Sequence, residues 1–278
     1  MHGFFGDRRG DYEYEQEQEE NLVAPVRIGH YFPGYMVRLI LFDIDGTLVR
    51  TGGAGVKAFA KVFATEFGAT DGFDGLRFAG RTDRSLVREF FNLHGIPATP
   101  ENFDRFFERY VFWLDHILQD SHKAVCAGVW EFLEQLQSLD PPPTLGLLTG
   151  NIRLGAEIKL RHFKLWDLFV TGAFADDHED RDQIAAIARG RGSRLLGREL
   201  EGREVLVIGD TPLDIRCARA IGAKVLAVAT GGAELAELQR HQPDWALPHL
   251  GKITAKAVVC SSDQARQLTV AQRPAKVS

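Results

Sequence analysis

The sequence is poor in cysteine, has no long apolar run and carries no excess of positive charge, and each shortage excludes a class of protein. Its cysteines, Cys126, Cys217 and Cys260, lie far apart without a CxxC pair, so we expect neither a disulfide framework nor a zinc site. No run of about 18 apolar residues and no secretion signal is found, which argues against a membrane span. A formal net charge of −5 with scattered basic residues argues against nucleic-acid binding. The sequence therefore predicts a cytoplasmic protein that binds neither nucleic acid nor membrane.

What the sequence does contain is a series of short apolar runs separated by helix-like segments. The runs are rich in Val, Ile, Leu or Phe and end near Asp, Thr or Gly: VRLILFD, TLGLLTG, LFVTGAF, EVLVIGD and KVLAVAT. Continuous apolar runs of this length are typical of strands covered on both faces, and intervening helices are typical of parallel crossovers. We therefore predict an α/β fold with a doubly wound, mostly parallel, Rossmann-like sheet.

One interval between these runs is too long for a simple crossover. About a hundred residues separate the first run from TLGLLTG, against roughly thirty in a whole βαβ unit. Apolar residues recur there at helical spacing, so we predict a helical insertion over residues 52–124 in a core formed by residues 37–51 and 125–250. Its aromatic stripe is expected to pack between helices: Phe103, Phe106, Phe107, Tyr110 and Trp113.

Both ends of the chain lack a sustained period. Residues 1–36 are polar and acidic in their middle, and residues 251–278 are weakly patterned, so we expect a disordered N-terminal tail and a flexible C-terminal tail. Met36 stands directly before the first strand, and translation starting there is a hypothesis. Native peptides from before Met36, detected by mass spectrometry, would reject it.

Polar side chains follow the first strand in the segment DIDGT. Alternation along the strand sends Asp43 and Asp45 to the same side, and Gly46 permits a sharp turn beside them. Two carboxylates at a strand end suit Mg²⁺, and one of them can act as nucleophile while the other transfers protons. A solvated Asp-Gly turn is the alternative. A calcium loop is disfavoured because Ala54 stands where such a loop has glutamate.

The strand TLGLLTG ends in residues that suit phosphate binding. Thr149 offers a hydroxyl, and Gly150 and Asn151 offer backbone amides at an expected helix start. A threonine that merely caps the helix explains the same residues.

Two further clusters follow later strands. Arg181 is the one cation in the acidic segment DDHEDRDQI, and a phosphate site needs such a fixed positive charge, although a solvated loop is the alternative. Asp210 ends the strand EVLVIGD and Asp214 follows at a helix opening, which favours a shared cation. Asp214 serving only its helix N-terminus is the alternative.

Taken in order, DIDGT, LLTGN, Arg181 and GDTPLD resemble the four motifs of the haloacid dehalogenase superfamily. The resemblance covers roughly residues 38–250 and is closest to phosphoglycolate-phosphatase-like members with a helical cap after the first motif. It implies that Asp43 attacks phosphorus to form an aspartyl phosphate, while Asp45 protonates the leaving alcohol and then activates water. It also implies that Thr149 and Arg181 hold the phosphoryl oxygens, with the Asn151 amide nearby.

The same resemblance implies a Mg²⁺ cofactor. Its ligands would be the Asp43 carboxylate, the Asp45 backbone carbonyl and Asp210, with Asp214 in or next to that shell. The sequence departs from the family at the third motif, which is more often lysine. Arginine keeps the charge but is larger and fork-shaped, which affects the placement of Arg181.

The resemblance also predicts a small phosphate monoester as substrate. The segment GRTDRSL resembles the cap loop of phosphoglycolate-phosphatase-like proteins, with Arg81 and Thr82 as substrate contacts and Arg81 or Arg84 as a partner for a substrate carboxylate. A helix N-cap with solvated arginines is the alternative. We therefore predict a phosphatase acting on an ester such as 2-phosphoglycolate.

Other functions remain as alternatives at this point. A phosphomutase of the same superfamily would use Asp45 but retain the phosphoryl group, and a non-catalytic module would bind phosphate only. A dehalogenase is disfavoured, because that reaction in this superfamily needs neither the second aspartate nor the metal.

Overall fold

A six-stranded sheet forms the centre of the protein in the computed structural model, which describes residues 36–72 and 78–260. The strands lie in the order β5-β4-β1-β6-β7-β8 and every neighbouring pair is parallel. Their bounds are β1 Leu39–Phe42, β4 Thr144–Leu148, β5 Thr171–Ala173, β6 Val205–Gly209, β7 Lys224–Val228 and β8 Trp245–Leu247. The predicted doubly wound α/β fold is confirmed.

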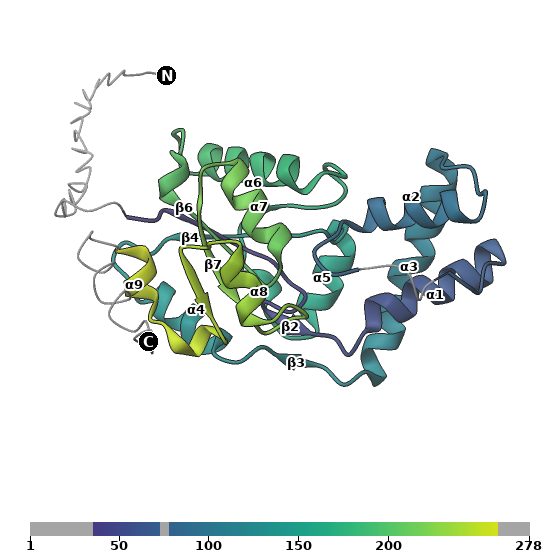
Figure 1. Ribbon diagram of the computed structural model, residues 1–278, viewed down its shortest axis with the longest axis horizontal. Helices are drawn as coiled ribbons and strands as arrows, with labels where there is room; N and C mark the ends of the chain where they lie inside the picture. Colours follow the sequence, from purple (N-terminus) through teal and green to yellow (C-terminus); the bar gives the residue numbers. More distant parts are fainter. Residues whose placement is uncertain (1–35, 73–77, 261–278) are drawn as a thin grey trace, which may run out of the picture. The chain divides into compact units, whose positions relative to one another are not determined.

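Helices cover both faces of this sheet, as Figure 1 shows for α6 and α7 on one side and α4 and α9 on the other. The central strand β1 shows why a continuous apolar run is needed. Leu39 and Leu41 belong to the apolar cluster that contains α6 and α7, whereas Ile40 and Phe42 belong to the cluster that contains α4, α5 and α9. These helices are α4 Val129–Gln137, α5 Arg153–Arg161, α6 Arg181–Leu195, α7 Pro212–Ala220 and α9 Ala255–Val259.

The chain leaves this sheet after β1 and forms three helices, counted over its described residues, before it returns. They are α1 Ala54–Phe67, α2 Asp83–Leu93 and α3 Pro100–Asp120. Aromatic side chains fill the space between them, with Phe59, Phe90, Phe106 and Tyr110 all buried. The apolar residues thus form a separate cluster, which reaches the sheet-bearing part at Ile152.

A short antiparallel pair joins the two connections between these helices and the sheet. Strand β2, Val49–Arg50, pairs with β3, Ala124–Val125, and the Cys126 amide donates to the Leu48 carbonyl at 2.9 Å. The outgoing and returning chains therefore lie side by side next to the end of β1.

The C-terminal part differs from the expectation of a tail beginning at residue 251. The 3-10 helix Leu250–Lys252 and α9 pack on the sheet-bearing part, and Ala255, Val258 and Val259 are buried. The Val37 amide also donates to the Val259 carbonyl at 3.0 Å, so α9 is tied to the entry of β1. The apolar pattern of this segment is weak in the sequence because α9 is short and buries only one face. Residues 1–35 and 261–278, on which the other tail predictions fall, lie outside the described residues.

The remaining elements are short. Helix α8, Leu235–Arg240, precedes β8, and 3-10 turns occur at Trp166–Leu168 and Gly202–Glu204. Within residues 36–72 and 78–260, none of the helices is both long and apolar enough to cross a bilayer.

Candidate active site

Three carboxylates converge at the carboxyl end of the sheet, beside its central strand. Asp43 follows β1, Asp210 follows β6, and Asp214 lies in the first turn of α7. Their oxygens lie within 4.8 Å of one another, and all three residues are buried. Strands β4 and β6 flank β1, so the strand order reverses at this point, where open α/β sheets bind their ligands.

Local structure holds two of these carboxylates in place. Thr211 caps α7, and Asp214 Oδ2 accepts hydrogen bonds from the Thr211 amide at 2.9 Å and the Thr211 hydroxyl at 2.7 Å. Thr47 donates to Asp210 Oδ1 at 3.1 Å. Gly46 has φ +86°, and a Cβ there would lie 2.6 Å from Asp210 Oδ2, so glycine is required where the two segments meet.

A buried guanidinium joins the carboxylates. Arg181 is the first residue of α6, and its Nη2 donates to Asp43 Oδ1 at 2.9 Å and to Asp214 Oδ1. Its Nη1 donates to the Gly80 carbonyl at 3.2 Å, which links the guanidinium to the loop before α2. Its Nε has no hydrogen-bond partner among the described residues.

The carboxylate cluster fits a divalent cation. Burial, and then the nearby Asp214 carboxylate, raise the pKa of Asp210 well above its usual range. Burial also raises the pKa of Asp43 to about 7, and the Arg181 guanidinium only partly opposes this. Once ionised, three carboxylates with one guanidinium would carry an excess of negative charge, and a hard cation with oxygen ligands, such as Mg²⁺, would balance it and favour the ionised forms.

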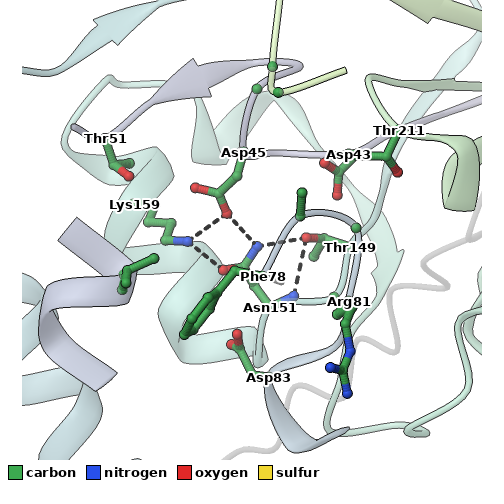
Figure 2. Close-up of a pocket in the computed structure, with 18 of the residues that line it drawn as sticks. Asp43, Asp45, Thr51, Phe78, Arg81, Asp83, Thr149, Asn151, Lys159 and Thr211 are labelled. Carbon is green, nitrogen blue, oxygen red and sulfur yellow. Dashed lines mark hydrogen bonds and ion pairs between the residues drawn. The ribbon is translucent and has the colours of Figure 1, made fainter. Parts of the chain in front are cut away.

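Asp45 has different partners, which Figure 2 shows. Its Oδ2 accepts hydrogen bonds from Lys159 Nζ at 2.6 Å and from Asn151 Nδ2 at 2.9 Å. Asn151 Nδ2 also donates to the Thr149 hydroxyl at 2.8 Å. The Asp45 carboxylate therefore lies outside the three-carboxylate cluster. If Asp45 binds a metal ion at that cluster, it does so through its backbone carbonyl, as the family resemblance implies.

The loop from Thr149 to Asn151 contacts the segment that precedes α2. Thr149 is fully buried, and α5 begins only at Arg153, so Thr149 does not cap that helix. The Gly150 carbonyl accepts from the Asp83 amide at 2.7 Å, and a Cβ on Gly150 would lie 2.1 Å from the Arg81 carbonyl oxygen. Only glycine permits this approach.

A cavity of about 430 Å³ opens between these groups. Asp43, Asp45, Thr149, Arg181 and Asp210 line it from the sheet side. The insertion and the chain leading into it contribute a mixed wall: Arg50, Phe59, Phe78, Arg81, Asp83 and Tyr110. The predicted catalytic side chains therefore share one cavity with side chains from the helical insertion.

The arginines predicted to meet substrate have different positions. Arg81 lines the cavity, although it forms an ion pair with Glu89 at 2.5 Å. Arg84 lies over the Phe103 ring and 3.9 Å from Glu179, and it is not among the described lining residues. Thr82 caps α2 and its hydroxyl donates to the Glu179 carbonyl at 2.8 Å, so the structure gives it a structural role.

A family model for haloacid dehalogenase-like hydrolases matches residues 40–228, which is more than half of the chain. The chain belongs to this family. The match spans Asp43, Asp45, Thr149, Arg181, Asp210 and Asp214, and it confirms the resemblance on which the site prediction rests. No curated protein matches the sequence significantly.

Solved structures of several bacterial proteins have the same fold. A predicted phosphoglycolate phosphatase from Haemophilus somnus is 19% identical, with a TM-score of 0.61 over 77% of this chain and 95% of that one. CbbY from Rhodobacter sphaeroides, solved with phosphate, is 17% identical, with a TM-score of 0.62 over 81% and 99%. A candidate β-phosphoglucomutase from Bacteroides vulgatus is 19% identical, with a TM-score of 0.62 over 83% and 93%. At these identities the likeness shows the fold alone.

Lys159 and Asp83 also belong to the site, but the sequence analysis did not predict them. Lys159 is buried and bonds Asp45, and Asp83 is buried in the cavity wall with Oδ2 accepting from the Ile152 amide at 2.8 Å. Burial raises the pKa of Asp83 to about 7, and Lys159 partly opposes this. The position of Lys159 along α5 could have indicated its burial, because it lies on the same helix face as the buried Gly155 and Ala156.

Proposed function

We propose that this protein is a Mg²⁺-dependent phosphatase that hydrolyses a small phosphate monoester through an aspartyl-phosphate intermediate. One observation carries the proposal: Asp43 lies buried at the end of the central strand, within 4.8 Å of two further carboxylates and 2.9 Å from the Arg181 guanidinium. A nucleophilic carboxylate beside both an anion-binding cation and a cation-binding cluster is what phosphoryl transfer requires.

Each residue has a part in the proposed reaction. Asp43 attacks phosphorus, the bond to the leaving oxygen breaks, and Asp45 gives that oxygen a proton. Asp45 then takes a proton from water, which attacks the phosphorus and releases inorganic phosphate with Asp43 restored. Thr149 and Arg181 hold the phosphoryl oxygens, and Asn151 keeps Asp45 and Thr149 together.

Asp43, Asp210 and Asp214, with the Asp45 carbonyl, would hold the Mg²⁺ ion. When bound, the ion supplies charge that offsets the negative charge of the phosphoryl group. Without it, the raised pKa values of Asp43 and Asp210 indicate carboxyls that resist ionisation.

We further propose that residues 52–124 act as a cap that selects the leaving group. The insertion supplies Phe59, Arg81, Asp83 and Tyr110 to the cavity wall. A cavity of about 430 Å³ suits a small organic phosphate. Arg81 is the cation through which a carboxylated ester of the 2-phosphoglycolate type would be recognised, in exchange for its ion pair with Glu89.

The test is phosphate release from a panel of esters by the purified protein, with Mg²⁺ and with EDTA. We expect release with Mg²⁺, loss of release with EDTA and recovery when Mg²⁺ is restored. Absence of release from every ester would contradict the proposal and favour a non-catalytic phosphate-binding module.

A phosphomutase is the second candidate, favoured by the fold shared with the candidate β-phosphoglucomutase from Bacteroides vulgatus. Product analysis with a hexose 1-phosphate separates the two reactions. A mutase yields the isomeric hexose phosphate, whereas a phosphatase yields free hexose and inorganic phosphate.

We also propose a reducing, cytoplasmic setting, because Cys126, Cys217 and Cys260 are all free thiols in the structure. A disulfide detected in the native protein by mass spectrometry would contradict this assignment.

A further inference from the structure

A buried lysine that the four motifs do not include lies beside the proposed acid-base residue. Lys159 is on α5, and its side chain is only 5% exposed. Its Nζ donates to Asp45 Oδ2 and to Asn151 Oδ1, each at 2.6 Å. Asn151 Nδ2 in turn donates to the same Asp45 oxygen at 2.9 Å. Lys159, Asp45 and Asn151 therefore form a closed triangle of hydrogen bonds (Figure 2).

The triangle restrains a side chain that would otherwise move freely. A buried ammonium is costly unless it is paired, so Lys159 strongly favours the arrangement in which Asp45 stays within reach. The amide of Asn151 is also fixed in orientation, because its oxygen must face the ammonium and its nitrogen must face Asp45. The restraint thus acts on Asp45 both directly and through Asn151.

The restraint acts on one oxygen of the carboxylate only. Oδ2 accepts the hydrogen bonds from both Lys159 and Asn151, whereas Oδ1 has no hydrogen-bond partner within residues 36–72 and 78–260. The Asp45 side chain is 41% exposed and lines the cavity. An anchored Oδ2 leaves Oδ1 as the atom available to exchange a proton.

We propose that Lys159 is a positioning residue that holds the Asp45 carboxylate where it can protonate the leaving oxygen and accept a proton from water. The assignment rests on the proposed phosphatase function. Lys159 differs from Arg181, which contacts Asp43 and Asp214 and serves the phosphoryl group. The alternative role for Lys159 is direct binding of a substrate anion, for which the ammonium would have to leave Asp45.

The leaving group distinguishes these roles. An alkyl phosphate needs a proton on its leaving oxygen, whereas p-nitrophenyl phosphate releases a stable anion. If Lys159 acts through Asp45, Lys159→Met should lower kcat/KM for an alkyl phosphate by about 10- to 100-fold, since misplacing a catalytic group by about 1 Å has that effect. The loss for p-nitrophenyl phosphate should be clearly smaller.

A double-mutant cycle with Asp45→Asn gives the second measurement. Once Asp45 is removed, the added Lys159→Met change should alter kcat/KM by less than about threefold, because coupled residues are not additive. Arg161→Met is the matched control, since it removes an exposed cation from the same helix that pairs with Glu157 and not with Asp45. That control should retain wild-type kinetics.

The outcomes separate the two proposals. Equal losses on both esters, or the same loss in the Asp45→Asn background, would overturn the role of Lys159 while leaving phosphatase activity established. A wild type inactive on the whole panel would overturn both. If Lys159→Met does not unfold cooperatively, Lys159→Gln, which keeps a donor in the buried site, takes its place in the same cycle.

Discussion

Asp43 and Asp45 are separated by one residue, yet they occupy two different environments. Asp43 is buried with Asp210, Asp214 and Arg181, and burial raises its pKa to about 7. Asp45 has a side chain that is 41% exposed and bonds Lys159 and Asn151. Two carboxylates that are neighbours in the sequence thus have different surroundings in one cavity. The surroundings of Asp43 suit a metal and a nucleophile, and those of Asp45 suit proton transfer.

The backbone explains how they separate. Asp43 directly follows β1 and still bonds to the neighbouring strand β6, because its amide donates to the Ile208 carbonyl at 2.9 Å. Asp45 has already left the sheet and pairs with Val49 in an isolated bridge, and Gly46 turns the chain beside Asp210. Both carboxylates line the same cavity, but they are held by different elements.

Asp43→Asn should have the largest effect on activity. An amide cannot attack phosphorus, so we expect hydrolysis to fall by about 10⁴-fold or more, as for other nucleophile deletions. Circular dichroism should report an intact fold. Activity within tenfold of the wild type would contradict the assigned nucleophile.

Asp45→Asn should have a smaller and more selective effect. Loss of a general acid-base group typically costs about 10²- to 10⁴-fold, and kcat/KM for alkyl phosphates should fall more than for p-nitrophenyl phosphate. Mg²⁺ affinity, measured by calorimetry, should remain near the wild-type value because the Asp45 side chain lies outside the carboxylate cluster. A large fall in Mg²⁺ affinity would contradict this prediction and indicate that the Asp45 side chain takes part in metal binding.

Asp210→Asn tests whether the buried carboxylate cluster around Asp43 binds the metal ion. Thr47 can still donate to the amide oxygen, but the cluster loses one negative ligand. We expect the Mg²⁺ concentration for half-maximal activity to rise at least about tenfold, the size of effect seen when the surroundings of a bound metal are altered. The same requirement as the wild type would contradict a metal at this cluster.

The weakest effect should be on the pH dependence of stability, and it concerns Asp83, which is buried in the cavity wall with Asp43 and Asp210. Its pKa is raised from 3.8 to about 7, so the folded protein holds a proton that the unfolded chain releases over this range. The free energy of unfolding should therefore fall as pH rises from about 4 to 7. Asp43 and Asp210 act in the same direction in metal-free protein.

Thermal unfolding in EDTA at pH 5 and pH 7.5 measures this dependence. Asp83→Asn should weaken it, because the amide does not titrate and its oxygen can still accept from the Ile152 amide. Asp104→Asn, at an exposed position on α3, is the control and should leave it unchanged. An unaltered pH dependence in Asp83→Asn would contradict a protonated Asp83.

Much of the fold followed from local pattern. The runs that became β1, β4, β5, β6 and β7 were visible because strands covered on both faces must be apolar throughout. Strand β8 was missed, since Trp245–Leu247 is a short edge strand that is only partly buried. Helix α9 was missed for a related reason, because its five residues span little more than one turn.

The order of the motifs along the chain can be predicted from local pattern, because acidic, hydroxyl and cationic residues stand at the ends of successive apolar runs. Parallel strands then bring such ends to one edge of the sheet. Which of these side chains contact one another depends on the packing of the folded protein. Lys159 and Arg181 reach the two neighbouring aspartates from different helices, and Asp83 enters the cavity from the insertion. Local sequence does not encode these contacts, because they depend on how helices far apart in the chain pack against the same sheet.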